Sequence, residues 1–280
     1  MCSASPEVPE QDPLAGRHIL VTGGTRGIGR AIVDGAVRRG ARVSFLGRDA
    51  TAVVEVEKLL IDAGQVAGVA ADVVDEAAVR AAVAALEARL GPVDVLVNNA
   101  GLNTSQGPLH DCDLGGWWRD VSVNVLGVAV CSAAVLPSMI ARGRGRIISM
   151  VSGTAGRATP YNSAYASAKA AVVRLSDSLA AEVGEHGIAV FALRPGTIAT
   201  DMVARFSASP ATQRYMGDEV AAMQARTPER AVEATLFLAG GRGDALTGLW
   251  IDADEDLEGL AARADELRAN GLYQLRRRRT

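Results

Sequence analysis

Short apolar runs alternate along this chain with longer stretches whose hydrophobic residues recur at helical spacing. Runs of the length of buried strands lie at 18–22, 41–46, 65–71, 93–97, 147–151, 187–193 and 249–252. Stretches long enough for helices lie between them, at 30–39, 51–63, 75–90, 113–140, 163–184 and 228–239. This steady alternation predicts an α/β fold with one doubly wound parallel sheet and helices on both faces.

Three segments depart from the alternation. Residues 201–226 have no clear period, contain Pro210 and Gly217, and follow a predicted strand, so we expect a substrate lid there. Residues 1–14 are expected to form a flexible tail before a single domain at 15–253. The extension 254–280 begins with acidic residues and predicts an amphipathic helix of about four turns, followed by the basic tail Arg276–Arg279, interpreted as a solvated end.

Composition excludes several classes of protein. The chain has 280 residues, a net charge of −3 and a pI near 5.7, so nothing favours nucleic acid as a partner. Its three cysteines and three histidines are scattered, which predicts neither a disulfide framework nor a metal site. We expect no signal peptide and no membrane-spanning helix, and therefore a cytoplasmic protein.

Glycines gather directly after the first predicted strand, in the run Thr22-Gly23-Gly24-Thr25-Arg26-Gly27-Ile28-Gly29. A predicted helix follows at once. Glycines let the backbone approach a pyrophosphate, and the amino end of the helix supplies N–H donors and a positive dipole. The run therefore predicts a dinucleotide site.

The second predicted strand ends in Gly47-Arg48-Asp49, which leaves two interpretations of the cofactor. An acid about 20 residues past the glycines holds the ribose hydroxyls of NAD in many such folds, and Asp49 has that spacing. Arg48, together with Arg26, would instead bind the 2′-phosphate of NADP, because the planar guanidinium fork matches phosphate. We favour NADP(H), with NAD(H) as the alternative.

Candidate chemistry lies further along the chain. Tyr165 and Lys169 stand at i and i+4 in an alanine-rich run, so both side chains share one helix face. A nearby cation lowers the pKa of a phenol, so we expect Tyr165 to exchange protons near neutral pH. Ser152 follows a predicted strand, where open α/β sheets bind ligands. Asn124 lies in an apolar run, and on spacing alone it is interpreted as a buried structural residue that needs partners.

Taken together, these motifs resemble the short-chain dehydrogenase/reductase family over about residues 16–252. The resemblance implies a Rossmann-type fold and a catalytic tetrad of Asn124, Ser152, Tyr165 and Lys169. It implies that Tyr165 is the acid or base, that Lys169 lowers its pKa, that Ser152 polarises the carbonyl and that Asn124 retains a water. The implied cofactor-binding residues are Gly23, Thr25, Arg26, Gly27, Ile28, Gly29, Arg48, Asp72, Val73, Asn99, Ala100, Gly101, Tyr165, Lys169, Pro195, Gly196, Ile198 and Thr200.

The implied function is an NADP(H)-dependent interconversion of a ketone and a secondary alcohol. A hydroxylated or natural-product intermediate is the expected substrate, with candidate contacts at Asn103, Gly153, Thr154, Tyr161 and Met202. Three alternatives stay open: a 3-oxoacyl-thioester reductase, since such reductases share the motif set, a family epimerase or dehydratase, and a non-catalytic NADP-binding regulatory protein. The resemblance also implies a homotetramer or homodimer through the helices that contain Asn124 and Tyr165.

One stretch differs from the family pattern. Relatives often end the last strand in Val-Asp-Gly-Gly, whereas this chain has Trp250-Ile251-Asp252-Ala253 and then the extension. The extension either alters assembly, by reaching a neighbouring subunit, or packs on its own subunit.

Overall fold

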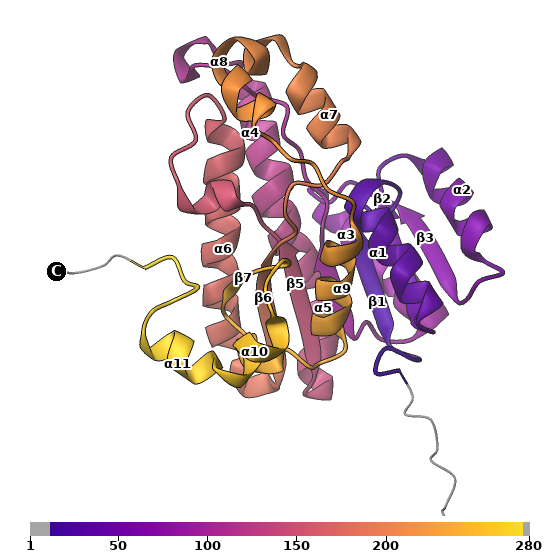
Figure 1. Cartoon of the computed structure of the whole chain (residues 1–280). Helices are drawn as coiled ribbons and strands as arrows, with labels where there is room; N and C mark the ends of the chain where they lie inside the picture. Colours follow the sequence, from indigo (N-terminus) through magenta and orange to yellow (C-terminus); the bar gives the residue numbers. More distant parts are fainter. Residues whose placement is uncertain (1–11, 277–280) are drawn as a thin grey trace, which may run out of the picture.

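Seven parallel strands form the centre of the molecule in the computed structural model, which describes residues 12–276 (Figure 1). Their order in the sheet is β3-β2-β1-β4-β5-β6-β7. The strands are β1 (His18–Thr22), β2 (Arg42–Gly47), β3 (Val66–Ala70), β4 (Val95–Asn98), β5 (Gly145–Met150), β6 (Ile188–Arg194) and β7 (Trp250–Asp252). The predicted doubly wound sheet is confirmed.

The order of the strands reverses at β1, which pairs with β2 on one side and with β4 on the other. Val21 is in register with Phe45 and with Val97, so these three strands end at a common level. Ligands of open α/β sheets bind in the crevice outside the carboxyl ends of such strands. The topology therefore locates the candidate site before any side chain is considered.

Helices cover both faces of the sheet (Figure 1). One face packs mainly on α1 (Gly27–Arg38), α2 (Ala50–Leu60) and α9 (Glu229–Ala239). The other packs on α3 (Glu76–Leu90), α5 (Gly127–Arg142) and α6 (Ser163–Val183). Because both faces are buried, the strands read as continuous apolar runs in the sequence.

The helix expected at 113–140 is interrupted, although the glycine pair Gly115-Gly116 does not break it. It begins as α4 (Leu114–Val121), whose first turn is capped by Asp113, which accepts from both of those glycine N–H groups. A π-helical turn, η2 (Ser122–Leu126), then leads into α5. Such turns insert an extra residue into a helix and often mark functional sites. Here the turn contains Asn124.

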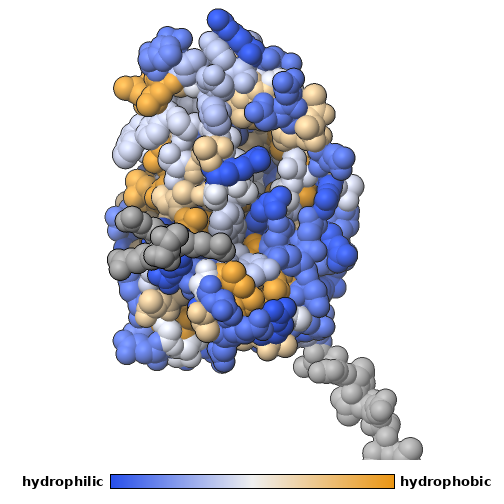
Figure 2. All heavy atoms as spheres, turned by 60° about the vertical axis from the view of Figure 1, so that its left-hand side comes forward, coloured by the Kyte–Doolittle hydropathy of each residue, from blue (hydrophilic) through white to orange (hydrophobic). Residues whose placement is uncertain are grey.

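The helical run Leu114–Arg142 is the one described helix that bears on the expectation about membranes. By length and composition it could cross a membrane, and residues 121–141 carry no charge. Half of its most apolar window is buried inside the protein, as in the core helix of a folded domain. The face shown in Figure 2 is mostly hydrophilic, with separate hydrophobic patches.

The predicted lid is helical rather than irregular. It forms α7 (Asp201–Ala208) and α8 (Pro210–Ala221), which lie together above the sheet in Figure 1. Pro210 does not break this segment because it occupies the first position of α8, where a missing N–H costs nothing. Ala199 N–H donates to Arg226 O and Arg226 N–H donates to Thr197 O, so the two ends of the lid are paired.

Both ends of the domain differ from expectation. Leu14 is fully buried, so the folded part begins before residue 15; the rest of the predicted tail, residues 1–11, lies outside the described residues. The extension forms two short helices, α10 (Leu257–Ala262) and α11 (Ala264–Ala269), instead of one. Their apolar residues Leu257 and Leu267 are buried in the core of this same chain. The extension thus packs on its own subunit, and arginines 277–279 lie outside the described residues.

Candidate active site

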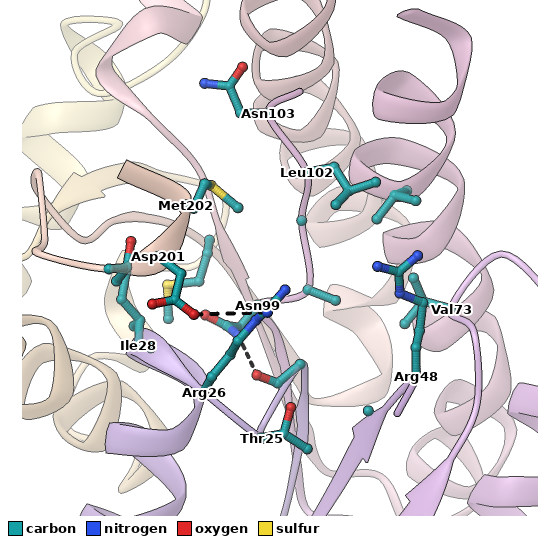
Figure 3. Close-up of a pocket in the computed structure, with 18 of the residues that line it drawn as sticks. Thr25, Arg26, Ile28, Arg48, Val73, Asn99, Leu102, Asn103, Asp201 and Met202 are labelled. Carbon is teal, nitrogen blue, oxygen red and sulfur yellow. Dashed lines mark hydrogen bonds and ion pairs between the residues drawn. The ribbon is translucent and has the colours of Figure 1, made fainter. Parts of the chain in front are cut away.

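A cavity of about 520 Å³ opens at the carboxyl ends of β1, β2, β4 and β5. Figure 3 shows side chains from the glycine-rich turn, the end of β2, the segment after β4 and the lid converging on it. The predicted site residues that line it are Gly23, Thr25, Arg26, Gly27, Ile28, Arg48, Asp72, Val73, Asn99, Ala100, Gly101, Asn103, Tyr165, Lys169, Pro195, Thr200 and Met202.

The glycine-rich turn has the conformation that only glycine adopts readily. Gly23 and Gly27 have φ angles of 67° and 57°, in the left-handed region. A Cβ atom on Gly29 would lie 2.3 Å from the carbonyl oxygen of Gly23 and 2.4 Å from Asn99 Nδ2. Gly29 therefore does not line the cavity; its role is to let helix α1 approach the strand ends closely. This leaves the amino end of α1 beside open space that a dinucleotide pyrophosphate fits.

The segment after β4 is fastened to the end of β1. Thr22 Oγ1 accepts from the N–H groups of Asn99 and Ala100, both at 3.0 Å, and Asn99 Nδ2 donates to Thr22 O at 2.9 Å. These bonds hold the Asn-Asn-Ala-Gly segment at 98–101 in position against the glycine-rich turn.

The charged groups of both cofactor interpretations lie at the end of β2 and in the glycine-rich turn. Asp49 caps α2, where its Oδ1 accepts from Thr51 N–H at 2.9 Å and from Ala52 N–H at 3.2 Å. Arg48 and Arg26 both line the cavity. Arg26 is directed across it toward Asp201 of the lid, at 3.9 Å (Figure 3). The acid at NAD spacing thus caps a helix, and it also lines the cavity together with the two guanidinium groups.

Asn124 is held rigidly by the π-helical turn. Its Nδ2 donates to Leu102 O at 2.6 Å and to Asp120 O at 2.8 Å, while its buried Oδ1 has no hydrogen-bond partner among residues 12–276. A Cβ on Gly101 would lie 2.8 Å from that oxygen and 3.7 Å from Lys169 Nζ. Asn124 and Lys169 therefore flank the same backbone position, with a hydrogen-bond acceptor left open beside the lysine.

Tyr165 and Lys169 both line the cavity from helix α6. Lys169 is only 5% exposed, donates from Nζ to Met150 O at 2.9 Å, and lies 5.5 Å from the centroid of the Tyr165 ring. Ser152 precedes the short helix η3 (Gly153–Gly156), and its Oγ accepts from Thr154 N–H at 3.3 Å. The three residues converge at the ends of β5 and α6.

The electrostatics of this group differ from the expectation. Burial raises the pKa of Tyr165 to about 12, and a hydrogen bond with Ser152 opposes that rise. Burial also lowers the pKa of Lys169 to about 8. Because both groups lose hydration, each favours its neutral form. The expected lowering of the pKa of Tyr165 by Lys169 is therefore not present in this structure, although Ser152 acts in that direction.

The lowered pKa of Lys169 predicts a pH-dependent stability. Between about pH 8 and pH 10.5 the unfolded chain holds a proton on Lys169 that the folded chain has released, so stability rises with pH in this window. Between these pH values, the free energy of unfolding of the wild type should rise by up to about 3 kcal/mol relative to that of a Lys169→Met variant. Urea unfolding of both proteins at several pH values measures this; a constant difference between pH 7 and 10 would contradict it.

Several predicted site residues lie outside the cavity. Gly29, Gly196 and Ile198 do not line it, nor do Asn124 and Ser152. Asn124 lies against Gly101, and Ser152 is hydrogen-bonded to Tyr165, so both adjoin residues that line the cavity. Among the substrate candidates, Gly153 lies against Arg194, and the side-chain oxygen of Thr154 is buried. Tyr161 stacks on Tyr215 of the lid with ring centroids 4.8 Å apart. These three do not line the cavity, and only Asn103 and Met202 of that set reach it.

Two kinds of residue at the site were not predicted from the sequence. Asp120 is fully buried and accepts from Thr104 N–H at 2.7 Å and from Ser105 N–H at 2.9 Å, so it organises the loop after β4. Asp120 lies four residues before Asn124 and therefore on the same helix face. This spacing could have indicated from the sequence that Asp120 lies near the site. Asp201 and Arg205 line the cavity from α7; no signal marked them, because the lid had no visible helical period.

Comparisons with known proteins identify the family of this chain. The family model described as short chain dehydrogenase matches residues 17–211. The chain is 34% identical to gluconate 5-dehydrogenase of Gluconobacter oxydans, over 86% of this chain and 94% of that protein. It is 39% identical to the inactive 2-(S)-hydroxypropyl-CoM dehydrogenase 2 of Xanthobacter autotrophicus, over 76% and 93%.

Among solved structures, the chain resembles a gluconate 5-dehydrogenase from Burkholderia cenocepacia in complex with NADP and tartrate. The TM-score is 0.78 at 30% identity, over 90% of this chain and 98% of that one. The family match covers well over half of the chain, and the relatives align across nearly their full length. This protein belongs to the short-chain dehydrogenase/reductase family of oxidoreductases.

Proposed function

We propose that this protein is an NADP(H)-dependent oxidoreductase that interconverts a ketone and a secondary alcohol by a Tyr-Lys-Ser-Asn mechanism. The observation that carries the proposal is the convergence of Tyr165 and Lys169 with the glycine-rich turn on one cavity. Ser152 and Asn124 adjoin the cavity through Tyr165 and Gly101, which line it. The cofactor, when bound, supplies or accepts a hydride; the protein supplies position and the proton.

Tyr165 is the acid in the reductive direction. Its raised pKa keeps the phenol protonated at neutral pH, so it can donate a proton to the carbonyl oxygen of a ketone. The Ser152 hydroxyl donates a hydrogen bond to the same oxygen, which stabilises the negative charge that develops there. In the oxidative direction Tyr165 accepts the proton, and its high pKa makes it a strong base once deprotonated.

Lys169 and Asn124 support the return of that proton. The open Oδ1 of Asn124 lies beside the same backbone position as Lys169 Nζ, in a buried and polar place. A buried acceptor without a protein partner is typically satisfied by water. We infer a water between them that passes protons between Lys169 and solvent, inward after a reduction and outward after an oxidation.

The substrate is proposed to be hydroxylated. Asn103, Thr104 and Met202 all line the cavity. The part of the cavity where we expect the substrate therefore offers two polar side chains and one apolar side chain. The related gluconate 5-dehydrogenase structure contains tartrate, a polyhydroxylated acid, in addition to NADP. A 3-oxoacyl thioester remains the alternative, since its carbonyl would meet the same tetrad. A panel of sugar-acid, cyclic and 3-oxoacyl ketones, followed by NADPH oxidation, separates the two classes.

Arg48 is expected to determine the cofactor preference. An Arg48→Ala variant should bind NADPH about 10–100-fold more weakly, because one charge-assisted hydrogen bond contributes about 1.5–3 kcal/mol. Its affinity for NADH, which lacks the 2′-phosphate, should change by less than about threefold. Parallel fluorescence titrations of NADPH and NADH give both constants.

An exposed arginine that lies away from the cavity supplies the control for this titration. Arg80 forms an i,i+4 ion pair with Glu76 on α3, and Arg80→Ala should leave both affinities unchanged. Equal losses for NADPH and NADH in Arg48→Ala would show that Arg48 does not read the 2′-phosphate. Preference of the wild type for NADH would overturn the NADP(H) assignment itself.

We also propose a homo-oligomer, a tetramer or a dimer, and a cytoplasmic location. Exposed apolar side chains gather on the helices that contain or flank Asn124: Leu114, Trp118, Leu126 and Ile140. A second copy of the chain would cover them, and light scattering measures the resulting mass. The free thiols Cys112 and Cys131 support a reducing compartment.

A further inference from the structure

The chain end runs along the outer edge of the sheet. Strand β7 is the last in the order and pairs on its inner side with β6. On its outer side, Trp250 N–H donates to Tyr273 O at 2.8 Å. Tyr273 has a φ angle of 57° and donates from its hydroxyl to Glu255 Oε1 at 2.6 Å. The end of the extension thus occupies a position that an exposed edge strand would leave open.

The side chain of Trp250 connects this edge to the loop that follows Ser152. A Cβ on Gly156 would lie 2.8 Å from Cη2 of the indole ring. Trp250 also packs in an apolar cluster that includes Ala155 from the loop and Leu275 from the chain end. We call residues 152–156 the serine loop. Its far end is therefore covered by a ring that the chain end holds in place.

A second connection reaches the near end of the serine loop. A Cβ on Gly153 would lie 3.2 Å from Nε of Arg194. The guanidinium of Arg194 donates to Asp252 of β7, and Asp252 N–H donates to Glu255 Oε2 at 3.0 Å. Glu255 is the same residue that receives the Tyr273 hydroxyl. Gly153 and Gly156 of the serine loop thus lie against Arg194 and Trp250, whose positions depend on contacts with the extension.

From these contacts we infer that the extension, residues 254–276, positions the serine loop, with Trp250 and Arg194 as the positioning residues. The inference rests on the proposed function only in making Ser152 a catalytic group. Both side chains act on Ser152 through the backbone of its loop. A hydroxyl must lie within tenths of an ångström of its productive place, so a loosened loop lowers turnover without affecting cofactor binding.

The first test removes the contacts of the chain end. A protein lacking residues 271–280 loses Tyr273 and Leu275, while a matched control lacking only 277–280 keeps both. Hydrogen exchange read by mass spectrometry should accelerate at least about tenfold in the serine loop of the shorter protein. It should stay unchanged in the glycine-rich turn and in the control. Unchanged exchange in the serine loop would overturn the inference, whether or not the enzyme turns over any ketone.

The second test uses the contact between Trp250 and Gly156, in case the truncation unfolds the protein. Gly156→Ala places a methyl group against the indole and should lower kcat about tenfold for the ketone that the panel identifies. In a Trp250→Leu background, the same Gly156→Ala substitution should lower kcat by less than about twofold, because the indole ring that the methyl group would meet is absent. NADPH affinity should be unaffected in all three variants, since neither residue lines the cavity.

These readouts distinguish the inference from the proposed function. A wild type that reduces no ketone and oxidises no alcohol would overturn the proposed function, and the exchange data would still decide the inference. Equal effects of Gly156→Ala in the two backgrounds would show that Trp250 does not act on the loop. A parallel loss of NADPH affinity would indicate general destabilisation and would also overturn it.

Discussion

Replacing Tyr165 with phenylalanine should lower turnover by a factor of about 10²–10⁴, the range that a positioned general acid contributes. The phenyl ring keeps the shape of the side chain on α6, so only the hydroxyl is lost. NADPH affinity should remain within about twofold of the wild type. Single-turnover reduction of a ketone, with NADPH titrated separately by fluorescence, measures the two effects independently.

Tyr161→Phe is the matched control, because it also removes a phenol hydroxyl, from a tyrosine that lies four residues before Tyr165. Tyr161 stacks on Tyr215 and does not line the cavity, so its variant should keep full turnover. Equal activity of Tyr165→Phe and the wild type would remove Tyr165 from the catalytic role. The experiment also tests the non-catalytic alternative, which has a precedent in the related protein named as inactive.

Adding a single methyl group at Gly29 should lower both the stability of the protein and its affinity for NADPH. In Gly29→Ala the new Cβ would lie 2.3 Å from the Gly23 carbonyl oxygen, a backbone atom that can move only if the glycine-rich turn moves. We expect a loss of about 1–3 kcal/mol in unfolding free energy from overpacking. NADPH affinity should fall at least about tenfold, because the displaced turn carries the pyrophosphate site.

Gly184→Ala is the control for this substitution. Gly184 has a φ of −59°, and a Cβ atom added to it would meet no heavy atom within 4 Å, so alanine should be accepted or slightly stabilising. Urea unfolding and NADPH titration of both variants provide the comparison. Full NADPH affinity in Gly29→Ala would show that the close approach of α1 is not needed for cofactor binding.

The sequence by itself determined the fold and the location of the chemistry. Parallel strands that are buried on both faces appear as continuous apolar runs, and the helices between them have a visible period. Tyr165 and Lys169 are one helical turn apart, so their shared face follows from backbone geometry alone. The glycine-rich turn could also be predicted from the sequence. Gly23 and Gly27 have positive φ angles that favour glycine, so the turn leaves a visible run of glycines in the sequence.

Other features depended on contacts between segments distant in sequence. Gly115 and Gly116 have low helix propensity, but they lie in the first turn that Asp113 caps, and the interruption falls at Asn124 instead. Tyr161 looked like a substrate contact, but its ring is engaged by Tyr215 from the lid, 54 positions later in the chain.

Charge was the property least accessible from sequence. Spacing placed Lys169 beside Tyr165, and only burial revealed that the lysine has a lowered pKa and the phenol a raised one. Asp49 had the spacing of an NAD-binding acid, and only the structure showed that it caps α2. The role of the extension likewise depended on where Tyr273 and Trp250 meet. Local pattern determines which elements form, whereas hydration and long-range partners are decided by how those elements pack.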